Sequence, residues 1–396
     1  MIDLGKRLEE LESAGLRRRL RLIDGPQGPE VVLDGRPVLL LCSNNYLGLA
    51  DHPRLRQAAA DAALSLGTGS GASRLISGSM SIHAELEARL AEFKGAESAL
   101  LFGSGYLANS GTIAALAGRD EVVFSDELNH ASIIDGCRLA GAETFVYRHA
   151  DPEHLEWGLR QAGGRAALIA TDGVFSMDGD LAPLRELVEL ARRHRCRLLV
   201  DEAHATGCIG PGGRGSVAAA GLTDEVDVIV GTLGKALGGY GAYVCGSTEI
   251  TDFLINTARP FIFSTAPPPP VVAAAQAALE ILVESPDRVE RLGRNAAALR
   301  QGLRAEGLQP IGSETQIVPL VIGEADDAMA LCERLLAEGV FAQAIRPPTV
   351  PPGTCRLRMT TMATHRMADL RRAAATVGAA TRDLGLAPPT VRALAA

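Results

Sequence analysis

Short apolar segments alternate with helical patterns from about residue 99 to residue 230, and this alternation restricts the fold more than any other feature of the chain. The expected strands are rich in Val, Leu, Ile and Ala, and lie at 99–102, 121–125, 143–147, 166–171, 197–200 and 226–230. Most of the segments between them have the 3.6-residue apolar period of a helix. Repeated strand–helix units predict an α/β protein with a mostly parallel sheet that helices cover on both faces.

The 396-residue chain exceeds a single ordinary core, so we expect a second, smaller domain. The predicted parts are an N-terminal arm at 1–48, a large domain at 49–285, a smaller α+β domain at 286–386 and a flexible tail at 387–396. Four consecutive prolines, Pro267 to Pro270, mark a rigid break shortly before the last domain.

The arm is expected to begin with a helix over 4–22. We interpret most of its arginines, at 17–19 and 21, as a solvated helix face. Residues 31–34 and 37–42 alternate around Gly35, a pattern typical of a hairpin.

Composition excludes several classes of protein. The net charge of −8 argues against a nucleic-acid surface. No apolar run approaches the roughly 18 residues that a membrane-spanning helix needs, and residues 1–21 lack the apolar core of a secretory signal, so a cytoplasmic protein is expected. Seven scattered cysteines without a CxxC pair favour reduced thiols over disulfides, and we expect no metal site.

Polar or glycine-rich segments follow four of the expected strands. They lie at 103–109, 171–180, 201–204 and 231–241. The carboxyl ends of parallel strands meet at one edge of a sheet, and ligands bind beyond that edge. We therefore expect these four segments to form one site.

The last of these segments, 231–241, places Lys235 among five glycines. The chain has only three lysines among its 39 basic residues, so the other 36 are arginines. Lysine can lose its proton and form an imine with a carbonyl, which a guanidinium group cannot do. Taken alone, Lys235 could equally be a turn residue or a nucleophile.

The residues around this lysine decide between the two interpretations. Asp201 could cap a helix, His204 could be a satisfied core histidine, and His130 could cap the helix that it begins. A buried carboxylate at a strand end, however, requires a cationic partner. Pyridoxal 5'-phosphate accounts for the whole set. It offers an aldehyde for Lys235, a protonated ring nitrogen for Asp201, a ring hydroxyl for His204 and a phosphate for the glycine turn at 103–106.

Eight stretches of the chain are similar to the fold type I pyridoxal-phosphate enzymes and, among them, to the α-oxoamine synthases. They include DELNHASIIDG, DGVFSMDGDLAPL, VDEAHATGCIGPGGRG and GTLGKALGG, and lie at 43–53, 71–87, 102–109, 126–136, 172–184, 200–215, 231–239 and 356–365. The resemblance extends from about residue 16 to about residue 377. It implies a fold type I transferase whose large domain has a mostly parallel, mixed sheet flanked by helices, beside a smaller α+β C-terminal domain.

The resemblance also implies roles for single residues. Lys235 forms the imine with the cofactor and removes the α-proton of the amino-acid substrate. Asp201 pairs with the ring nitrogen, His204 contacts the ring oxygen and His130 stacks on the ring. The remaining cofactor contacts that it implies are Ser104, Gly105, Tyr106, Ser176 and Thr232.

Three residues are implied to bind substrate. Arg358 binds the carboxylate of the amino acid with Asn44 alongside, and Arg17 is a further carboxylate contact. A guanidinium fork suits a carboxylate, but on the sequence alone Arg346 and Arg356 compete with Arg358. Only the family alignment selects Arg358.

The reaction implied is a decarboxylative condensation of an amino acid with an acyl thioester. Segments 261–265 and 344–351 are most similar to the member that joins L-alanine to pimeloyl-coenzyme A, or to a pimeloyl carrier protein, in biotin biosynthesis. The family also implies a homodimer with its sites at the interface.

Three alternatives remain open. One is a sibling synthase that uses glycine or serine with another thioester, and the second is an ordinary aminotransferase. The third is a non-catalytic partner subunit, although such subunits commonly lack the lysine that this chain has. Asn45 stands where many alanine-using members carry aspartate and where glycine-using members often carry asparagine.

Overall fold

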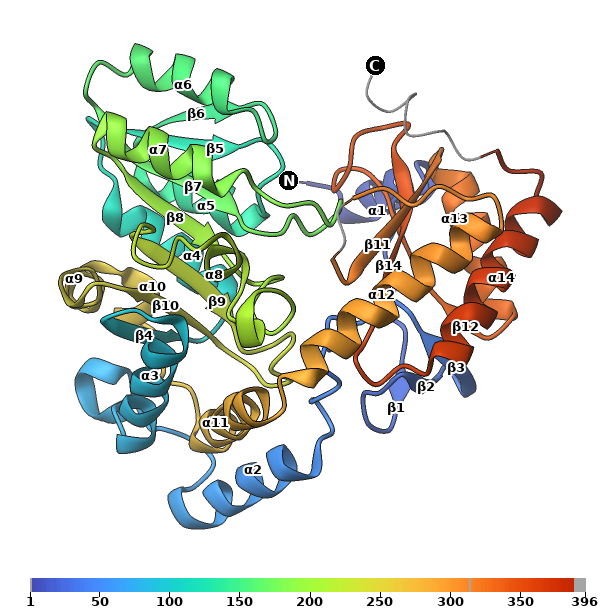
Figure 1. Ribbon diagram of the computed structural model, residues 1–396, viewed down its shortest axis with the longest axis horizontal. Helices are drawn as coiled ribbons and strands as arrows, with labels where there is room; N and C mark the ends of the chain where they lie inside the picture. The colour runs from blue at the N-terminus through green and yellow to red at the C-terminus, as the bar shows by residue number, and fades with distance from the viewer. Residues whose placement is uncertain (1, 313–314, 388–396) are drawn as a thin grey trace. The chain divides into compact units, whose positions relative to one another are not determined.

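The computed structural model describes residues 2–312 and 315–387. The chain forms two compact units (Figure 1). The terminal unit comprises the described residues of Met1–Asn44, Met177–Gly179 and Arg291–Ala396, and the central unit comprises Asn45–Ser176 and Asp180–Glu290. The predicted boundaries at 48/49 and 285/286 stay predictions. Residues 388–396 of the predicted tail lie outside the described residues.

A seven-stranded sheet forms the core of the central unit, in the order β4-β10-β9-β8-β7-β5-β6. The strands are Ser98–Phe102 (β4), Val122–Asp126 (β5), Glu143–Tyr147 (β6), Ala166–Asp172 (β7), Arg197–Asp201 (β8), Val228–Thr232 (β9) and Ala242–Gly246 (β10). From β9 to β6 all neighbouring strands are parallel, whereas β10 is antiparallel to both of its neighbours. The sheet is therefore mostly parallel and mixed, as predicted. β10 is the strand that the sequence analysis missed.

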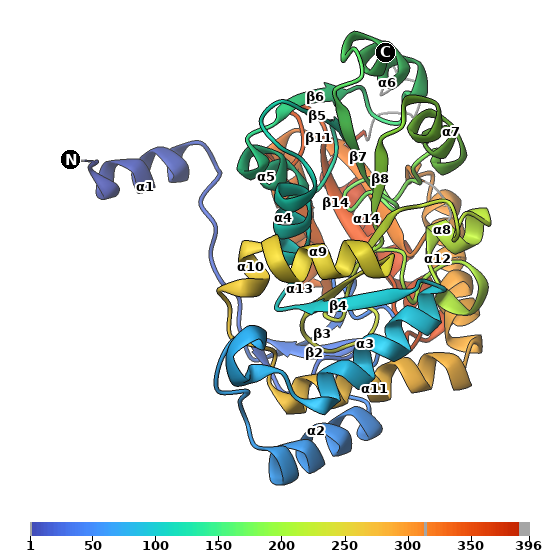
Figure 2. The ribbon, with the colours of Figure 1, turned by 90° about the vertical axis from the view of Figure 1, so that its left-hand side faces the viewer.

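Helices bury both faces of this sheet, which explains why its middle strands are mostly apolar. Every residue of β5 is buried, and so are the last four of β8. Helices α4 and α5 lie on one side of β5, β7 and β8, and α7 lies on the other (Figure 2). The helices of the unit are Pro53–Leu66 (α2), Ser81–Lys94 (α3), Gly105–Leu116 (α4), Ala131–Ala140 (α5), Pro152–Gln161 (α6), Leu184–His194 (α7), Ser216–Ala220 (α8), Thr248–Thr257 (α9), Arg259–Ile262 (α10) and Pro269–Glu284 (α11).

The terminal unit contains two smaller sheets, ordered β1-β2-β3-β12 and β11-β14-β13, with a shared apolar core. Their strands are Ile23–Asp24 (β1), Glu30–Leu33 (β2), Arg36–Leu40 (β3), Ile317–Gly323 (β11), Val340–Phe341 (β12), Gln343–Ile345 (β13) and Cys355–Thr360 (β14). Its longer helices are Asp287–Ala305 (α12), which begins in the central unit, Ala325–Ala337 (α13) and Met367–Asp383 (α14).

The predicted hairpin around Gly35 is confirmed. Strands β2 and β3 pair with Val31 opposite Val38, and the two turn residues Asp34 and Gly35 both have positive φ, at 48° and 77°. Two consecutive positive-φ residues match the right-handed twist of a two-residue hairpin.

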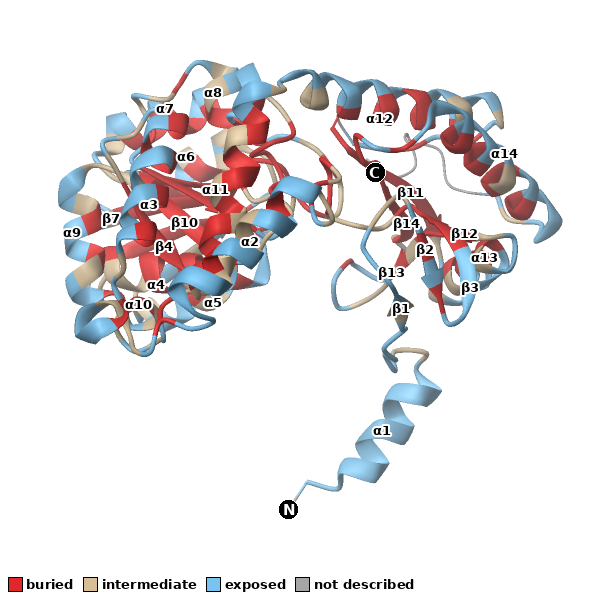
Figure 3. Cartoon of the chain, turned by 90° about the horizontal axis from the view of Figure 1, so that it is seen from below, coloured by how far each residue is buried: buried red, intermediate tan, exposed pale blue. Residues whose placement is uncertain are grey.

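The N-terminal helix is shorter than predicted, because α1 spans only Leu4–Ser13. It has no buried residue (Figure 3), and Gly15 takes a positive φ of 64° immediately after it. A residue in the left-handed region cannot continue a right-handed helix, so the helix ends before Gly15. Residues 16–22 have no helical structure. No helix of the described ranges is long and apolar enough to cross a membrane.

A buried ion pair fastens α3 to the loop that follows β8. Lys94 Nζ lies 3.1 Å from Glu202 Oε2, and the two side chains are only 1% and 0% exposed. The other carboxylate oxygen of Glu202 accepts hydrogen bonds from Ser216 Oγ at 2.5 Å and from the Val217 N–H at 2.8 Å. A buried carboxylate that lost its cation would destabilise the folded state strongly.

We therefore expect Lys94→Met to lower the free energy of unfolding by about 3–5 kcal/mol, measured by urea unfolding followed by circular dichroism. The double variant Lys94→Met/Glu202→Gln removes both charges and keeps an acceptor for Ser216, so it should recover most of the loss. A double variant that is as unstable as Lys94→Met would contradict this interpretation.

Candidate active site

The parallel register of the central sheet brings several strand ends together. Asp172 is the last residue of β7 and pairs in register with Asp201, the last residue of β8. Asp201 in turn pairs with Val230 on β9, whose chain continues into the loop of Lys235. The carboxyl edge of the sheet thus carries two acidic groups and leads directly into the lysine loop.

Lys235 takes part in a short chain of polar contacts. Its Nζ lies 2.8 Å from His204 Nε2, and His204 Nδ1 lies 2.7 Å from the hydroxyl of Tyr46. His204 and Tyr46 are 6% and 0% exposed. His204 is therefore buried and hydrogen-bonded through both ring nitrogens, one of them toward the lysine amine.

Two glycines explain why the lysine loop is so poor in side chains. A Cβ at Gly231 would lie 2.3 Å from the ring of Tyr243, and a Cβ at Gly238 would lie 2.6 Å from the backbone N of Ala50. Gly238 also has a positive φ of 64°. These glycines therefore let the loop pack closely against its neighbours on either side of Lys235.

Asp201 is 4% exposed and is held by N–H donors. Asn109 Nδ2 donates to Asp201 Oδ2 at 2.6 Å, and the Ala203 N–H donates to Oδ1 at 2.8 Å. Asn109 also donates to Ser132 Oγ at 2.9 Å, so α4 and α5 both contribute to this network.

The neighbouring carboxyl group, Asp172, has a different environment. It accepts the His130 N–H at 2.9 Å and is almost fully buried. Burial raises the pKa of Asp172 well above its ordinary value, and the nearby Asp201 raises it further. A buried carboxyl group with a raised pKa is common at catalytic sites.

His130 caps helix α5, the alternative that the sequence left open. Its Nδ1 accepts the Ser132 N–H at 3.3 Å and lies 2.7 Å from Ser132 Oγ. Burial lowers the pKa of His130, Asp201 opposes this and Lys235 adds to it. The cap therefore holds the ring of His130 at the start of α5, and the lowered pKa of this ring favours its neutral form.

The glycine turn after β4 leads into the N-terminus of α4. Ser104 is the cap residue and accepts the Leu107 N–H at 3.3 Å, and an added Cβ at Gly105 would meet nothing within 4 Å. Thr232 Oγ1 accepts the Gly234 N–H and donates to the Gly241 carbonyl, both at 3.1 Å. The first N–H groups of a helix attract anions, so this turn suits a phosphate.

Two further predicted contacts lie near these elements. Tyr106, on the first turn of α4, is 44% exposed, and its hydroxyl donates to Asp135 on α5. Ser176 is buried in the loop that follows β7.

The predicted substrate-binding residues lie in the terminal unit. Arg358 is buried on β14, and its two terminal nitrogens lie 3.4 and 3.5 Å from Asn44 Oδ1. Its sequence competitors have other partners within the chain. Arg356 forms an ion pair with Asp178, and Arg346 donates to the Gly15 carbonyl. Arg356 already has a carboxylate partner within the chain, which makes it less suited to a substrate carboxylate.

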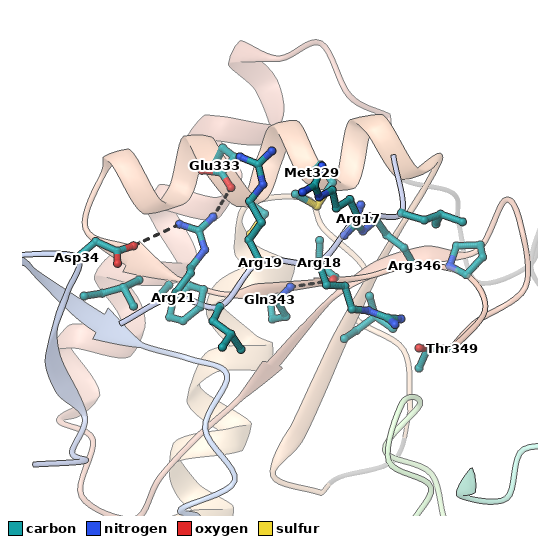
Figure 4. A pocket seen from close by; sticks show the side chains of 18 of the residues that line it. Arg17, Arg18, Arg19, Arg21, Asp34, Met329, Glu333, Gln343, Arg346 and Thr349 are labelled. Carbon is teal, nitrogen blue, oxygen red and sulfur yellow. Dashed lines mark hydrogen bonds and ion pairs between the residues drawn. The ribbon is translucent and has the colours of Figure 1, made fainter. Parts of the chain in front are cut away.

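Arg17 has a separate environment, a cavity of about 830 Å³ in the terminal unit (Figure 4). The lining combines apolar side chains, such as Met329 and Phe341, with five arginines: Arg17, Arg18, Arg19, Arg21 and Arg346. Arg17 pairs with Glu12 at 3.1 Å. Among the described residues the lining includes neither Asn44 nor Arg358, so the structure does not bring Arg17 to that pair.

Four residues that contact the predicted ones were not predicted from the sequence: Tyr46, Asn109, Ser132 and Asp172. Asp172 had a usable signal, because it ends β7 as Asp201 ends β8. Tyr46 and Asn109 lie inside the stretches that carried the family resemblance, but nothing in their local pattern indicates the side chain that each contacts.

The loop that carries Ser176 is anchored by His149, a half-buried histidine. His149 Nδ1 lies 3.0 Å from Asp126 Oδ1 at the end of β5, and its Nε2 lies 2.7 Å from Asp180 Oδ2. Burial alone would lower the pKa of His149, but the hydrogen bonds to Asp126 and Asp180 outweigh it and raise the pKa to about 10. His149 therefore stays protonated at neutral pH and holds Asp126 and Asp180 together in one triad.

This triad predicts how stability depends on pH. The pKa of His149 rises from 6.5 to about 10 on folding, so its stabilisation is complete below pH 6.5 and is lost as the pH rises toward 10. His149→Gln should lower the free energy of unfolding by about 3 kcal/mol at pH 6. The difference from the unmodified protein should shrink steadily in urea unfolding at pH 6, 8 and 10. A difference that stays constant over this range would show that the charge of His149 contributes nothing.

The sequence and fold match known proteins over most of their length. Residues 36–377 match the family model of the class I and II aminotransferases. A curated 8-amino-7-oxononanoate synthase from Geobacter sulfurreducens is 57% identical, over 96% of this chain and 98% of the relative.

Two solved structures share the fold. One, described as a high resolution structure of SPT with PLP internal aldimine, gives a TM-score of 0.92 at 35% identity, over 96% of this chain and 97% of that chain. The other, 8-amino-7-oxononanoate synthase from Francisella tularensis, gives a TM-score of 0.76 at 27% identity, over 87% of this chain and 98% of that chain. The predicted fold class is thereby confirmed.

Proposed function

Because the chain belongs to the aminotransferase class I and II family, and within it to the α-oxoamine synthases, we propose that it condenses L-alanine with a pimeloyl thioester. The products are 8-amino-7-oxononanoate, CO2 and the free thiol, a step of biotin biosynthesis. The observation that carries this proposal is the placement of Lys235, His204 and Asp201 at one sheet edge, in a chain 57% identical to a named 8-amino-7-oxononanoate synthase.

The residues at this edge fit pyridoxal 5'-phosphate. Lys235 supplies an amine, Asp201 a buried carboxylate for a protonated ring nitrogen, and His204 a partner for the ring oxygen. The α4 N-terminus at Ser104 and Gly105 suits the phosphate, and the proposed further contacts are His130, Tyr106, Ser176 and Thr232. When bound, the cofactor supplies an aldehyde that captures the amino acid and a ring that accepts electrons from its α-carbon.

Lys235 and Arg358 then act on the α-proton and on the carboxylate of the amino acid. Lys235, as a free amine, takes the proton from the α-carbon of alanine. Arg358 binds the carboxylate of alanine through its fork, and Asn44 orients the guanidinium group. The new carbon–carbon bond forms as the thiol leaves. CO2 is lost afterwards, so the clamp must hold the carboxylate first and then release it.

The cavity at Arg17 suits the acyl substrate. Its five arginines beside an apolar lining match a hydrocarbon chain that ends in a carboxylate. We assign Arg17 to that carboxylate, which would replace the exposed ion pair of Arg17 with Glu12. The acyl carrier is coenzyme A or a carrier protein.

The site also bears on the alternatives. A non-catalytic subunit would not need Lys235 in contact with His204. Asn45, which departs from the aspartate of many alanine-using members, accepts the N–H groups of Leu49 and Ala50 at 2.9 and 3.1 Å. An aspartate oxygen could accept the same two bonds, so the departure preserves the turn and does not by itself indicate glycine.

We further propose a cytoplasmic homodimer with its sites at the interface. Helix α1 supports this proposal, because Leu4, Leu8 and Leu11 are exposed along it. Apolar residues at this spacing form one helix face that a second copy could cover.

The function is tested by combining the lysine variant with a choice of substrates. The purified protein mixed with pyridoxal 5'-phosphate should show the visible absorption of a Schiff base, and Lys235→Ala should abolish both this band and turnover. Alanine with pimeloyl-coenzyme A should give 8-amino-7-oxononanoate by mass spectrometry. Faster turnover of glycine with acetyl-coenzyme A would reassign the substrate, and an unmodified protein without the band would refute the cofactor.

The proposed binding of the alanine carboxylate by Arg358 predicts how a substitution changes kcat/KM. Arg358→Lys keeps the charge but loses the fork, so kcat/KM for alanine should fall about 10–100-fold. Steady-state kinetics with alanine varied at saturating thioester measure this. Arg356→Lys is the matched control, because Arg356 lies on the same strand and pairs with Asp178. If both variants lose activity equally, the assignment of Arg358 fails.

A further inference from the structure

A buried tyrosine that has no role so far contacts the histidine beside Lys235. Tyr46 is fully buried, and its hydroxyl lies 2.7 Å from His204 Nδ1. His204 Nε2, on the other side of the ring, lies 2.8 Å from Lys235 Nζ. The phenol, the imidazole and the amine therefore form one continuous chain of contacts.

Packing fixes the position of the phenol. The flanking side chains of Leu47 and Leu49 are 0% exposed. Asn45 Oδ1 accepts two backbone N–H groups of the same turn. This turn also packs against the lysine loop, where Gly238 approaches Ala50 too closely to carry a side chain. The turn of Tyr46 and the loop of Lys235 are thus held together on opposite sides of His204.

The chemistry of the three groups gives this arrangement a consequence. A neutral imidazole has one N–H and one lone pair, and its two nitrogens must share them. If the Tyr46 hydroxyl donates to Nδ1, the proton of His204 lies on Nε2 and points at Lys235. A free amine can accept that N–H, whereas an ammonium group has no lone pair with which to accept it.

We propose that Tyr46 is a positioning residue that holds His204 as the Nε2–H tautomer and so favours Lys235 as the free amine. The inference rests on the proposed function, because a free amine is the form that condenses with an aldehyde. It also places an N–H donor where the ring oxygen of the cofactor is expected.

Other groups also act on the charge of Lys235. His130, Asp172 and Cys208 interact with it electrostatically, and they lie on elements other than the turn of Tyr46. Substituting Tyr46 leaves all three in place. A change caused by Tyr46→Phe therefore reports on the hydroxyl, since phenylalanine keeps the ring that fills the site.

The experiment follows the reaction of the cofactor-free protein with pyridoxal 5'-phosphate from pH 6 to pH 10. The rate at which Schiff-base absorption appears depends on the fraction of free amine. In Tyr46→Phe the midpoint of the rate–pH profile should move up by about one pH unit, with an approximately tenfold slower reaction near pH 7. His204→Asn should show the same shift, and the double variant Tyr46→Phe/His204→Asn should add nothing to it.

Tyr243→Phe is the matched control. Tyr243 is also fully buried in the central unit, but its hydroxyl contacts Thr206 Oγ1 at 3.0 Å and not the histidine. Its profile should equal that of the unmodified protein. If Tyr46→Phe also leaves the midpoint unchanged while the unmodified protein forms the Schiff base, the role of Tyr46 is refuted and the proposed function stands. If the unmodified protein forms no Schiff base, both fail.

A second measurement does not depend on any tyrosine variant. Selective ¹⁵N labelling of the eight histidines gives the tautomer of each ring by NMR, and the signals lost in His204→Asn belong to His204. In the cofactor-free protein at a pH where Lys235 is a free amine, the proton should be on Nε2. A proton on Nδ1 would overturn the inference.

Discussion

The register of three parallel strands is the constraint on which the site depends. Asp172 pairs with Asp201, and Asp201 pairs with Val230, so the loops after β7, β8 and β9 leave the sheet at one edge. A shift of one residue in this register would turn every side chain of a strand to the opposite face. Asp201 would then point away from Asn109. The buried apolar residues on both faces of β7 and β8 oppose such a shift.

Helix packing and site chemistry are linked through the same residues. Asn109 lies on α4, a helix that covers one face of the sheet, and it donates to the carboxylate that is expected to meet the cofactor. His130 and Ser132 belong to the start of α5, the helix beside α4. On the other side of Asp201 the chain continues into Glu202, whose buried pairing with Lys94 fixes the turn that carries His204. We therefore expect a substitution of Asn109, Ser132 or Lys94 to displace a side chain of the candidate site.

Much of the fold and of the candidate site could be predicted from the sequence, because local residue patterns indicate these parts. Apolar runs gave the parallel strands, and the rarity of lysine singled out Lys235. The parts that could not be predicted depend on distant contacts. Strand β10 is a short run that becomes a strand by pairing with β4 and β9. In the sequence Tyr46 cannot be distinguished from other buried aromatic residues, because its contact with His204 lies 158 positions away.

One short segment of the terminal unit interrupts the chain of the central unit. Residues 177–179 belong to the terminal unit, although Ser176 and Asp180 on either side belong to the central unit. Asp178 pairs with Arg356 on β14, the strand that also carries Arg358, and Asp180 pairs with His149. Two ion pairs that lie two residues apart in the chain thus belong to different units, and residues 177–179 form the backbone connection between them.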